Sequence, residues 1–255
     1  MIAECLLIKN ENRYLLEHLA YNAAAGIEHF FIYDNLSDTP VVDFLRENAR
    51  EFLNICTVTR YHSNNNLQLD CYADYLREYR HVDWTVFCDT DECFTGNIRD
   101  AVSEYGDKYN CLSFAPILHG CNGRIFDDGG GMFDRFSGDT VDSAHHWYKC
   151  LARTADIAII KSPHSFEMRG KKMLYLSQFS YPQCVLHHFR YRSFEEWVAK
   201  IKRGTCLTTT VKDTHAIKDF FCNNKSISAD NPEVISLMKW QEVTLQTKQP
   251  TPPII

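Results

Sequence analysis

Two aspartates, Asp89 and Asp91, stand one residue apart directly after the apolar run WTVFC at 84–88, and they form the only Asp-x-Asp pattern in the chain. In an extended segment, residues i and i+2 point to the same side, so both carboxylates are predicted to face one hard divalent ion. Mg²⁺ or Mn²⁺ suits such oxygen ligands, whereas zinc prefers softer ones. The pair therefore predicts a metal site that gathers the phosphates of a ligand. The alternative is a chance occurrence in an acidic chain.

The segments before this pair alternate between strand and helix patterns. Apolar runs at 3–8, 28–33, 53–58 and 84–88 are predicted strands, with helices predicted between them, the last of these at 67–79. Thr39 and Pro40 are expected to cap and open the second helix. This order predicts an α/β fold: a single Rossmann-like domain with a mixed, mainly parallel sheet flanked by helices.

Polar residues follow two more of the predicted strands. Asn10 and Glu11 come after the first, and Asp34 and Asn35 come after the second. Ligands of open α/β sheets bind outside the carboxyl ends of the strands, so we expect these residues to meet the Asp89 region at one edge. The alternative for Asp34 is a structural role in shaping a turn and capping a helix.

The second half of the chain has a looser pattern. Residues 119–148 are rich in Gly and Asp, and we expect a long mobile loop that closes over a ligand. Ser193 and Glu196 predict a capping box, and Asn231 with Pro232 predicts a last helix. We expect one domain over 1–245, with halves at 1–118 and 119–245, and a tail at 246–255.

Composition narrows the class of protein. A net charge of -6 argues against a nucleic-acid partner. The eleven cysteines contain no CxxC pair, so they predict buried residues in a reducing compartment, although a zinc site of Cys150 with His145 and His146 is conceivable. No apolar run is long enough for a transmembrane segment. We expect a cytoplasmic protein, with peripheral contact at the inner face of a membrane left open.

Four motifs in order resemble those of GT-A glycosyltransferases near families 2 and 92. They are the segment LLIKNENRYLLEHLAYNAAAGIEHFFIYDNLSD, then Gln68 and Cys71, then WTVFCDTDECF, and later LHHFRYRSFEEWVAKIKRG. The resemblance runs from about residue 3 to residue 204. It implies a GT-A fold and a sugar transfer from a nucleoside diphosphate, with UDP as the expected nucleotide, to a glycan or other hydroxyl acceptor. The expected setting is polysaccharide biosynthesis.

The resemblance also implies roles for individual residues. Asp89, Asp91 and His188 would hold Mn²⁺ or Mg²⁺ on the donor diphosphate. The other donor-binding positions that it implies are Asn10, Glu11, Asp34, Asn35 and Lys149. Families 2 and 92 imply inversion at the anomeric carbon, which requires a base at the acceptor hydroxyl. We expect Glu167 in that role, with His164 as the second candidate; Asp127 and Asp128 in the loop stay open.

Two other functions fit parts of the pattern. A Mg²⁺-dependent phosphohydrolase of the haloacid dehalogenase type also places Asp-x-Asp after an apolar strand, but on the first strand and not the fourth. A non-catalytic binder of nucleotide sugars or carbohydrates would keep the fold without the reaction. Hydrolysis of a sugar nucleotide separates these alternatives, because a transferase often leaks donor to water.

Overall fold

The computed structural model describes residues 1–63, 67–141, 147–170, 172–203 and 213–246. The strands are β1 (Ile2–Ile8), β2 (His29–Asp34), β3 (Cys56–Arg60), β4 (Trp84–Cys88), β5 (Glu92–Gly96), β6 (Cys111–Phe114), β7 (Pro116–Leu118), β8 (Lys149–Arg153), β9 (Ile157–Ser162), β10 (Ser165–Met168), β11 (Met173–Leu176) and β12 (Cys184–His188). The α-helices are α1 (Asn12–Ala24), α2 (Val41–Asn48), α3 (Leu67–Tyr79), α4 (Ile98–Tyr105), α5 (Met132–Phe136), α6 (Phe194–Arg203), α7 (Asp213–Asn223) and α8 (Pro232–Gln246). Two short 3-10 helices, η1 (Arg50–Asn54) and η2 (Thr154–Asp156), complete them.

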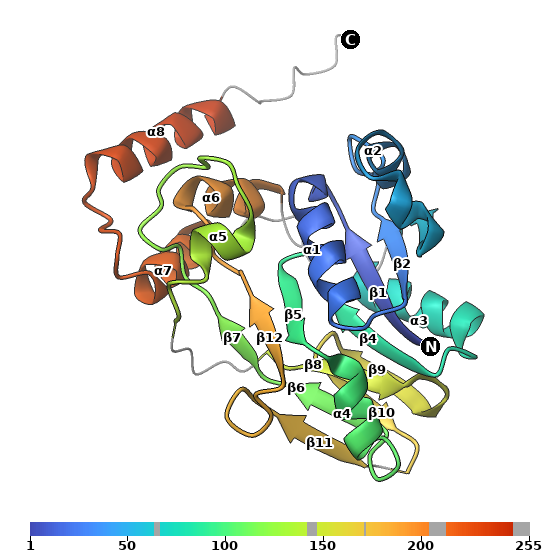
Figure 1. Ribbon diagram of the computed structural model, residues 1–255. Coiled ribbons are helices and arrows are strands. Elements are labelled where there is room, and N and C mark those ends of the chain that lie inside the picture. The colour runs from blue at the N-terminus through green and yellow to red at the C-terminus, as the bar shows by residue number, and fades with distance from the viewer. Residues whose placement is uncertain (64–66, 142–146, 171, 204–212, 247–255) are drawn as a thin grey trace.

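A seven-stranded sheet in the order β11-β6-β8-β4-β1-β2-β3 forms the centre of the fold (Figure 1). Every neighbouring pair is parallel except the two pairs that involve β8. The predicted mixed, mainly parallel sheet flanked by helices is therefore confirmed. Strands from both halves of the sequence share this sheet, since β6, β8 and β11 extend it beyond β4.

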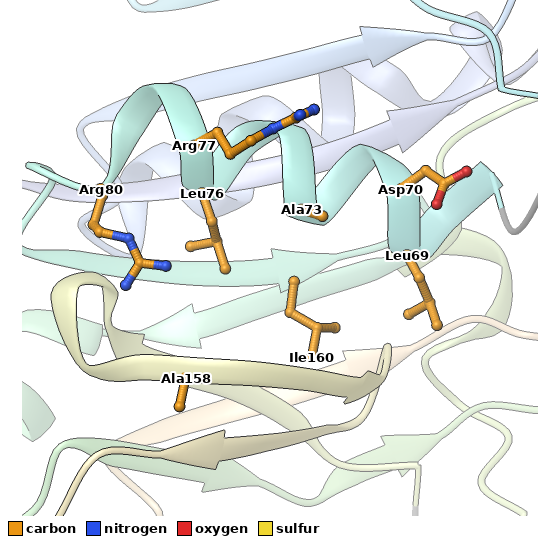
Figure 2. Close-up of a pocket in the computed structure, with 8 residues that line it drawn as sticks. All are labelled: Leu69, Asp70, Ala73, Leu76, Arg77, Arg80, Ala158 and Ile160. Carbon is orange, nitrogen blue, oxygen red and sulfur yellow. The ribbon is translucent and has the colours of Figure 1, made fainter.

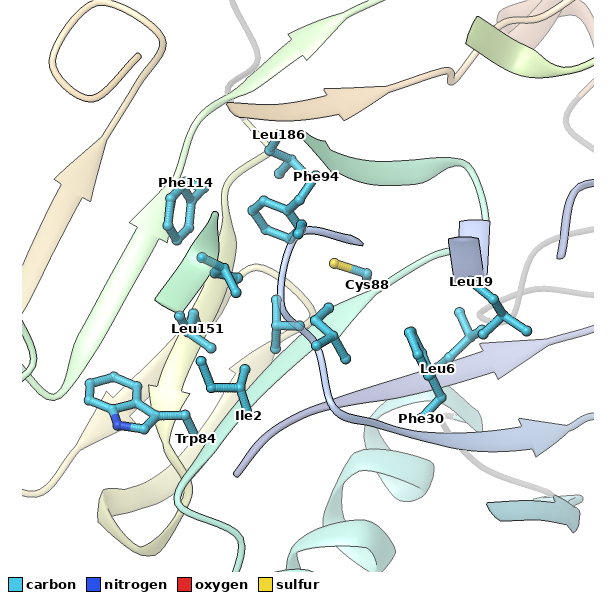
Figure 3. Packing of buried hydrophobic residues seen from close by; sticks show 14 of the residues in the cluster. Ile2, Leu6, Leu19, Phe30, Trp84, Cys88, Phe94, Phe114, Leu151 and Leu186 are labelled. Carbon is cyan, nitrogen blue, oxygen red and sulfur yellow. The ribbon is translucent and has the colours of Figure 1, made fainter. Parts of the chain in front are cut away.

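Alternating side chains of the strands bury both faces of the sheet. One face carries Leu6, Phe30 and Trp84, which pack with residues of α1, α2 and α4 (Figure 3). The other face carries Cys5 and Phe87, which pack with residues of α3 and of the β9–β10 hairpin. Fully apolar strands such as Trp84–Cys88 are typical of strands covered on both faces.

The chain leaves the main sheet at the end of β4. A tight turn, closed by the Glu92 amide donating to the Asp89 carbonyl at 2.9 Å, leads into β5. β5 then pairs with β12, and β12 with β7, in a separate three-stranded sheet. Helices α5 to α8 gather beyond the ends of β7 and β12 (Figure 1). This corner between two sheets places Asp89 and Asp91.

Two predicted helix features are present in the structure. α3 spans the predicted 67–79, and the box of Ser193 and Glu196 is present, with the Ser193 hydroxyl donating to Glu196 at 2.7 Å. α2 differs slightly, because Pro40 occupies the cap position and Val41 begins the helix.

The segment at 119–141 is more structured than a long loop. It contains the short helix α5, whose Met132 and Phe136 are buried against Tyr14 and Phe189. The carboxylate of Glu17 in α1 accepts the amides of Met132 at 2.6 Å and Phe133 at 3.0 Å. Closure of this segment over a ligand stays a prediction, and 142–146, including His145 and His146 of the conceivable zinc site, lies outside the described residues.

Candidate active site

The turn between β4 and β5 brings Asp89, Asp91 and Glu92 together. The two aspartates do not lie in an extended segment as the spacing suggested, because the Asp89–Glu92 hydrogen bond folds the chain into a turn. Asp91 and Glu92 are buried, whereas the Asp89 side chain is 37% exposed. Glu92 also accepts the Asp89 amide at 2.9 Å through its carboxylate. The turn therefore fixes three carboxyl groups in one small volume.

Lys149 faces the first aspartate. β8 runs antiparallel to β4 with Leu151 opposite Val86, so its first residue lies where β4 ends. The Lys149 Nζ is 2.8 Å from Asp89 Oδ2 and 2.9 Å from Glu92 Oε2, and its side chain is fully buried. Although burial opposes charge on Asp89, Lys149 holds the pKa of Asp89 below its usual value.

His188 reaches the second aspartate because β12 pairs with β5. In that register His188 lies opposite Glu92, and the Phe189 amide donates to the Asp91 carbonyl at 2.8 Å. His188 Nε2 is 3.7 Å from Asp91 Oδ1, and Nδ1 is 3.6 Å from Glu92 Oε1. Burial lowers the pKa of His188 to about 3, so the imidazole is neutral at physiological pH, the form that binds metals.

Two further cations surround Asp91. Lys200 of α6 places Nζ 2.6 Å from Asp91 Oδ2, and Arg192 places Nη2 3.4 Å from the same oxygen. Arg192 also holds Glu11, with Nη1 2.8 Å from Oε2. Burial disfavours a charged Asp91, but the cations Lys200 and Arg192 outweigh that cost and hold its pKa well below its usual value.

The charges of this cluster balance. Burial raises the pKa of Glu92 to about 8, with Asp89 and Asp91 adding to the effect, so Glu92 is mostly protonated at neutral pH. Three carboxylates then remain, those of Glu11, Asp89 and Asp91. They meet the three cations Lys149, Arg192 and Lys200, which is the condition for burying charge at acceptable cost.

The site is suited to a divalent ion by its donor types. Two carboxylates and a neutral imidazole are ligands that Mn²⁺ accepts. The Nδ1 of His188 and Oε1 of Glu92 are buried and lack hydrogen-bond partners, so polar atoms next to Asp91 are left unsatisfied. Within the described residues, however, no three His, Cys, Asp or Glu side chains are already grouped for a metal. Cations now neutralise the carboxylates.

The donor-binding candidates divide into two groups. Asn10 is exposed, with its Nδ2 3.1 Å from Asp38 Oδ2, and Asn35 is half-buried, so the ends of β1 and β2 lie side by side, while their meeting with Asp89 stays a prediction. Asp34 is fully buried and accepts hydrogen bonds from the amides of Ser37 and Val41 and from Arg60. Its contacts correspond to the turn-and-cap alternative and leave no surface for a ligand.

The two candidate bases, His164 and Glu167, lie in different surroundings. His164 lies at the β9–β10 turn, next to Tyr148, the residue that precedes Lys149. Its Nδ1 is 3.1 Å from the Tyr148 carbonyl, which leaves Nε2 as the acceptor. Glu167 lies on β10, where its side chain is 40% exposed and pairs with Lys161 at 3.1 Å. Phe166 beside it points into the core, so Glu167 points away, and the structure does not bring it to the cluster.

Asp127 and Asp128 are engaged elsewhere. Asp127 Oδ1 accepts from Arg13 at 2.8 Å, and Asp128 Oδ1 accepts from Arg135 at 2.9 Å. These ion pairs give both carboxylates a role in holding the segment before α5. Arg192, Lys200 and Glu92 were not predicted as site residues. Arg192 lies inside the HHFRYRS motif without a predicted role, and no periodicity distinguishes Lys200 from a surface lysine of an amphipathic helix.

A shallow groove of about 410 Å³ lies elsewhere, between α3 and β9 (Figure 2). None of the cluster residues lines it. Its charged side chains have local partners, since Arg77 pairs with Asp74 and Arg80 donates to the Ile157 carbonyl at 3.2 Å. The groove carries no grouping of side chains for chemistry.

Sequence comparison finds relatives described as family 92 glycosyltransferases. No protein-family model matches the chain. A glycosyltransferase family 92 protein of Oryza sativa subsp. japonica is 25% identical over 223 residues, which cover 82% of this chain and 36% of the relative. One of Ricinus communis is 23% identical over 219 residues, 79% of this chain and 37% of the relative. The chain is thus similar to family 92 glycosyltransferases, and it spans little more than a third of their length.

Solved structures give distant likenesses. The structure of S. aureus TarS 1-349 in complex with UDP has a TM-score of 0.46 and 14% identity, over 90% of this chain and 73% of that one. The structure of GalNAc-T7 with UDP, GalNAc and Mn²⁺ has a TM-score of 0.45 and 12% identity, over 99% of this chain and 58% of that one. In the described part of the chain, no helix has both the length and the apolar character to cross a membrane.

Proposed function

We propose that this chain is the GT-A catalytic domain of a metal-dependent, inverting glycosyltransferase. It moves a sugar from a nucleoside diphosphate donor, UDP in the first instance, to a hydroxyl of a glycan or other acceptor. The observation that carries the proposal is the joining of Asp89, Asp91 and His188 at the end of a central strand. The similarity to family 92 proteins supports the same class, and inversion follows that resemblance.

Asp89, Asp91 and His188 would hold Mn²⁺ or Mg²⁺, which when bound supplies Lewis-acid stabilisation of the departing diphosphate. Lys149 and Arg192 keep the two carboxylates ionised and oriented, since each is fixed by a second acidic partner, Glu92 and Glu11 respectively. We assign Asn10, Glu11, Asn35 and Lys149 to the donor side of the site. Asp34 acts there indirectly, by holding the turn that carries Asn35.

His164 is the better-placed of the two candidate bases. Its Nε2 carries a lone pair, because Nδ1 donates to the Tyr148 carbonyl, and Tyr148 directly precedes Lys149 of the cluster. Burial, with help from Lys149, lowers its pKa to about 4, so the imidazole is neutral at physiological pH and its Nε2 is unprotonated.

A panel of sugar nucleotides tests the proposal. Thermal shift with and without Mn²⁺ should give stabilisation by at least one UDP-sugar that depends on the metal, and slow release of UDP should accompany it. Stabilisation without any release, even with glycan acceptors, would favour a non-catalytic binder. Release of inorganic phosphate from a phosphomonoester, with no response to sugar nucleotides, would favour the phosphohydrolase.

A further inference from the structure

Asp91 Oδ2 has two cationic partners that differ in how firmly they are held. Arg192 is buried, bonded to Glu11 at 2.8 Å and stacked over the Tyr14 ring at 4.7 Å. The Lys200 side chain is 35% exposed, and its ion-pair partner among the described residues is Asp91 alone, at 2.6 Å. Arg192 is therefore fixed in place, whereas Lys200 is on a flexible stem with access to solvent.

The position of Lys200 conflicts with a divalent ion on the same carboxylate. An ammonium group 2.6 Å from Asp91 Oδ2 occupies one side of the group that the proposed function assigns to the metal. A divalent ion on the same carboxylate would be repelled by this ammonium group, because both are positive and the site is partly buried. Movement of Lys200 away from Asp91 therefore favours binding of the ion, and its exposed side gives it a path.

A diphosphate offers Lys200 a new partner in the same place. The ammonium group of lysine binds phosphate oxygens as a point charge with three donors. A diphosphate at Asp89 and Asp91 lies within reach of a side chain that already touches Asp91.

We propose that Lys200 is an exchangeable counter-ion. In the ligand-free protein it neutralises Asp91, and when metal and donor bind it transfers to the donor diphosphate. This inference rests on the proposed function. Lys200 then has opposite effects on two ligands, weakening the binding of the metal alone and strengthening the binding of the nucleotide with the metal.

The test measures both affinities by calorimetry in Lys200→Met. Mn²⁺ alone should bind at least about fivefold more tightly than in the wild type, a typical coupling between two competing cations. UDP in saturating Mn²⁺ should bind about tenfold more weakly, because a charge-assisted contact is lost. Lys200→Arg, which keeps the charge, should restore most of the UDP affinity. Lys218→Met, an exposed lysine of α7, is the control and should change neither affinity.

Unchanged or weaker Mn²⁺ binding in Lys200→Met would overturn the counter-ion role, and unchanged UDP binding would overturn the transfer to phosphate. A loss of both affinities with a large fall in melting temperature would show a structural role instead, and would also overturn the proposal. If the wild type and Lys218→Met bind neither Mn²⁺ nor UDP, the proposed function itself fails, which the wild-type titration alone reveals.

Discussion

Asp89 and Asp91 are separated by one residue, yet different parts of the chain neutralise them. Lys149 of β8 pairs with Asp89, whereas Lys200 of α6 and Arg192 pair with Asp91. A metal bound by both carboxylates would therefore connect the central sheet with the C-terminal helices. This explains how two short side chains influence elements far apart in the sequence.

At the same scale, substitution of the two candidate bases gives a direct comparison. His164→Gln should lower the transfer rate about 100-fold, the usual contribution of a positioned base, because Nε2 no longer accepts a proton. Glu167→Gln should leave the rate within about twofold, since an exposed pair such as Glu167 with Lys161 contributes little. Steady-state kinetics with the donor identified by the panel measures both. Loss of activity in Glu167→Gln with His164→Gln still active would reverse the assignment.

At the scale of elements, helix α1 holds strand β5 through one amide. Asn22 Oδ1 accepts the Phe94 amide at 2.8 Å, while its Nδ2 donates to Glu4 at 2.9 Å. Glu4 in turn contacts His18 Nε2 at 2.5 Å, and all three of these side chains are fully buried. Asn22 thus accepts a backbone hydrogen bond from β5, as a neighbouring strand would. Strand β5 carries Glu92, and it positions His188 because it pairs with β12.

Replacement of Asn22 should loosen this arrangement. Asn22→Leu leaves the Phe94 amide and the Glu4 carboxylate with fewer partners, so the free energy of unfolding should fall by about 2 kcal/mol. Urea unfolding measures this, and UDP affinity in Mn²⁺ should fall in the same variant. Asn48→Ala is the control, since Asn48 is exposed on α2 and its Nδ2 donates to the Phe44 carbonyl of its own helix. Equal stability of the two variants would contradict the role of Asn22.

At the scale of the whole molecule, the strands and helices of the first half were easier to predict from the sequence than those of the second half. Strands with continuous apolar runs, such as Trp84–Cys88, and the capped helices follow local rules, so their limits were predictable. β8 was not, because KCLAR has a charged residue at each end and its role depends on insertion between β4 and β6. Lys149 was therefore predicted as a donor-binding residue only from the family resemblance. The contact of Lys200 with Asp91 depends on how α6 packs against the site, and such a tertiary contact leaves no pattern in the local sequence.

Buried histidines should make the stability of the whole molecule depend on pH. His187 Nδ1 is 2.9 Å from His119 Nε2, and its Nε2 is 2.9 Å from Thr95 Oγ1. Burial, with His119 adding, lowers the pKa of His187 to about 4, below the unfolded value of about 6.5. Between these pH values the unfolded chain binds the extra proton, so stability falls as the pH drops from about 6.5 to about 4.

Melting temperatures over this range, for the wild type and His187→Gln, isolate that contribution. The wild type should lose stability more steeply on acidification, because the variant lacks the titrating ring. Other groups, including Glu92 with its opposite tendency, affect both proteins alike. Parallel curves for the two proteins would exclude His187 as a source of the pH dependence.

Calorimetry of UDP binding tests the central claim most directly, namely that Asp91 and a divalent ion together hold the nucleotide. With Mn²⁺ the wild type should bind UDP, and chelator should weaken the affinity at least about tenfold, because no ion then bridges the diphosphate to Asp89 and Asp91. Asp91→Asn should bind as weakly in Mn²⁺ as the wild type does in chelator while keeping its fold, since Arg192 retains Glu11 and Lys200 reaches solvent. Equal UDP affinity in Mn²⁺ and in chelator, unaltered by Asp91→Asn, would contradict the account.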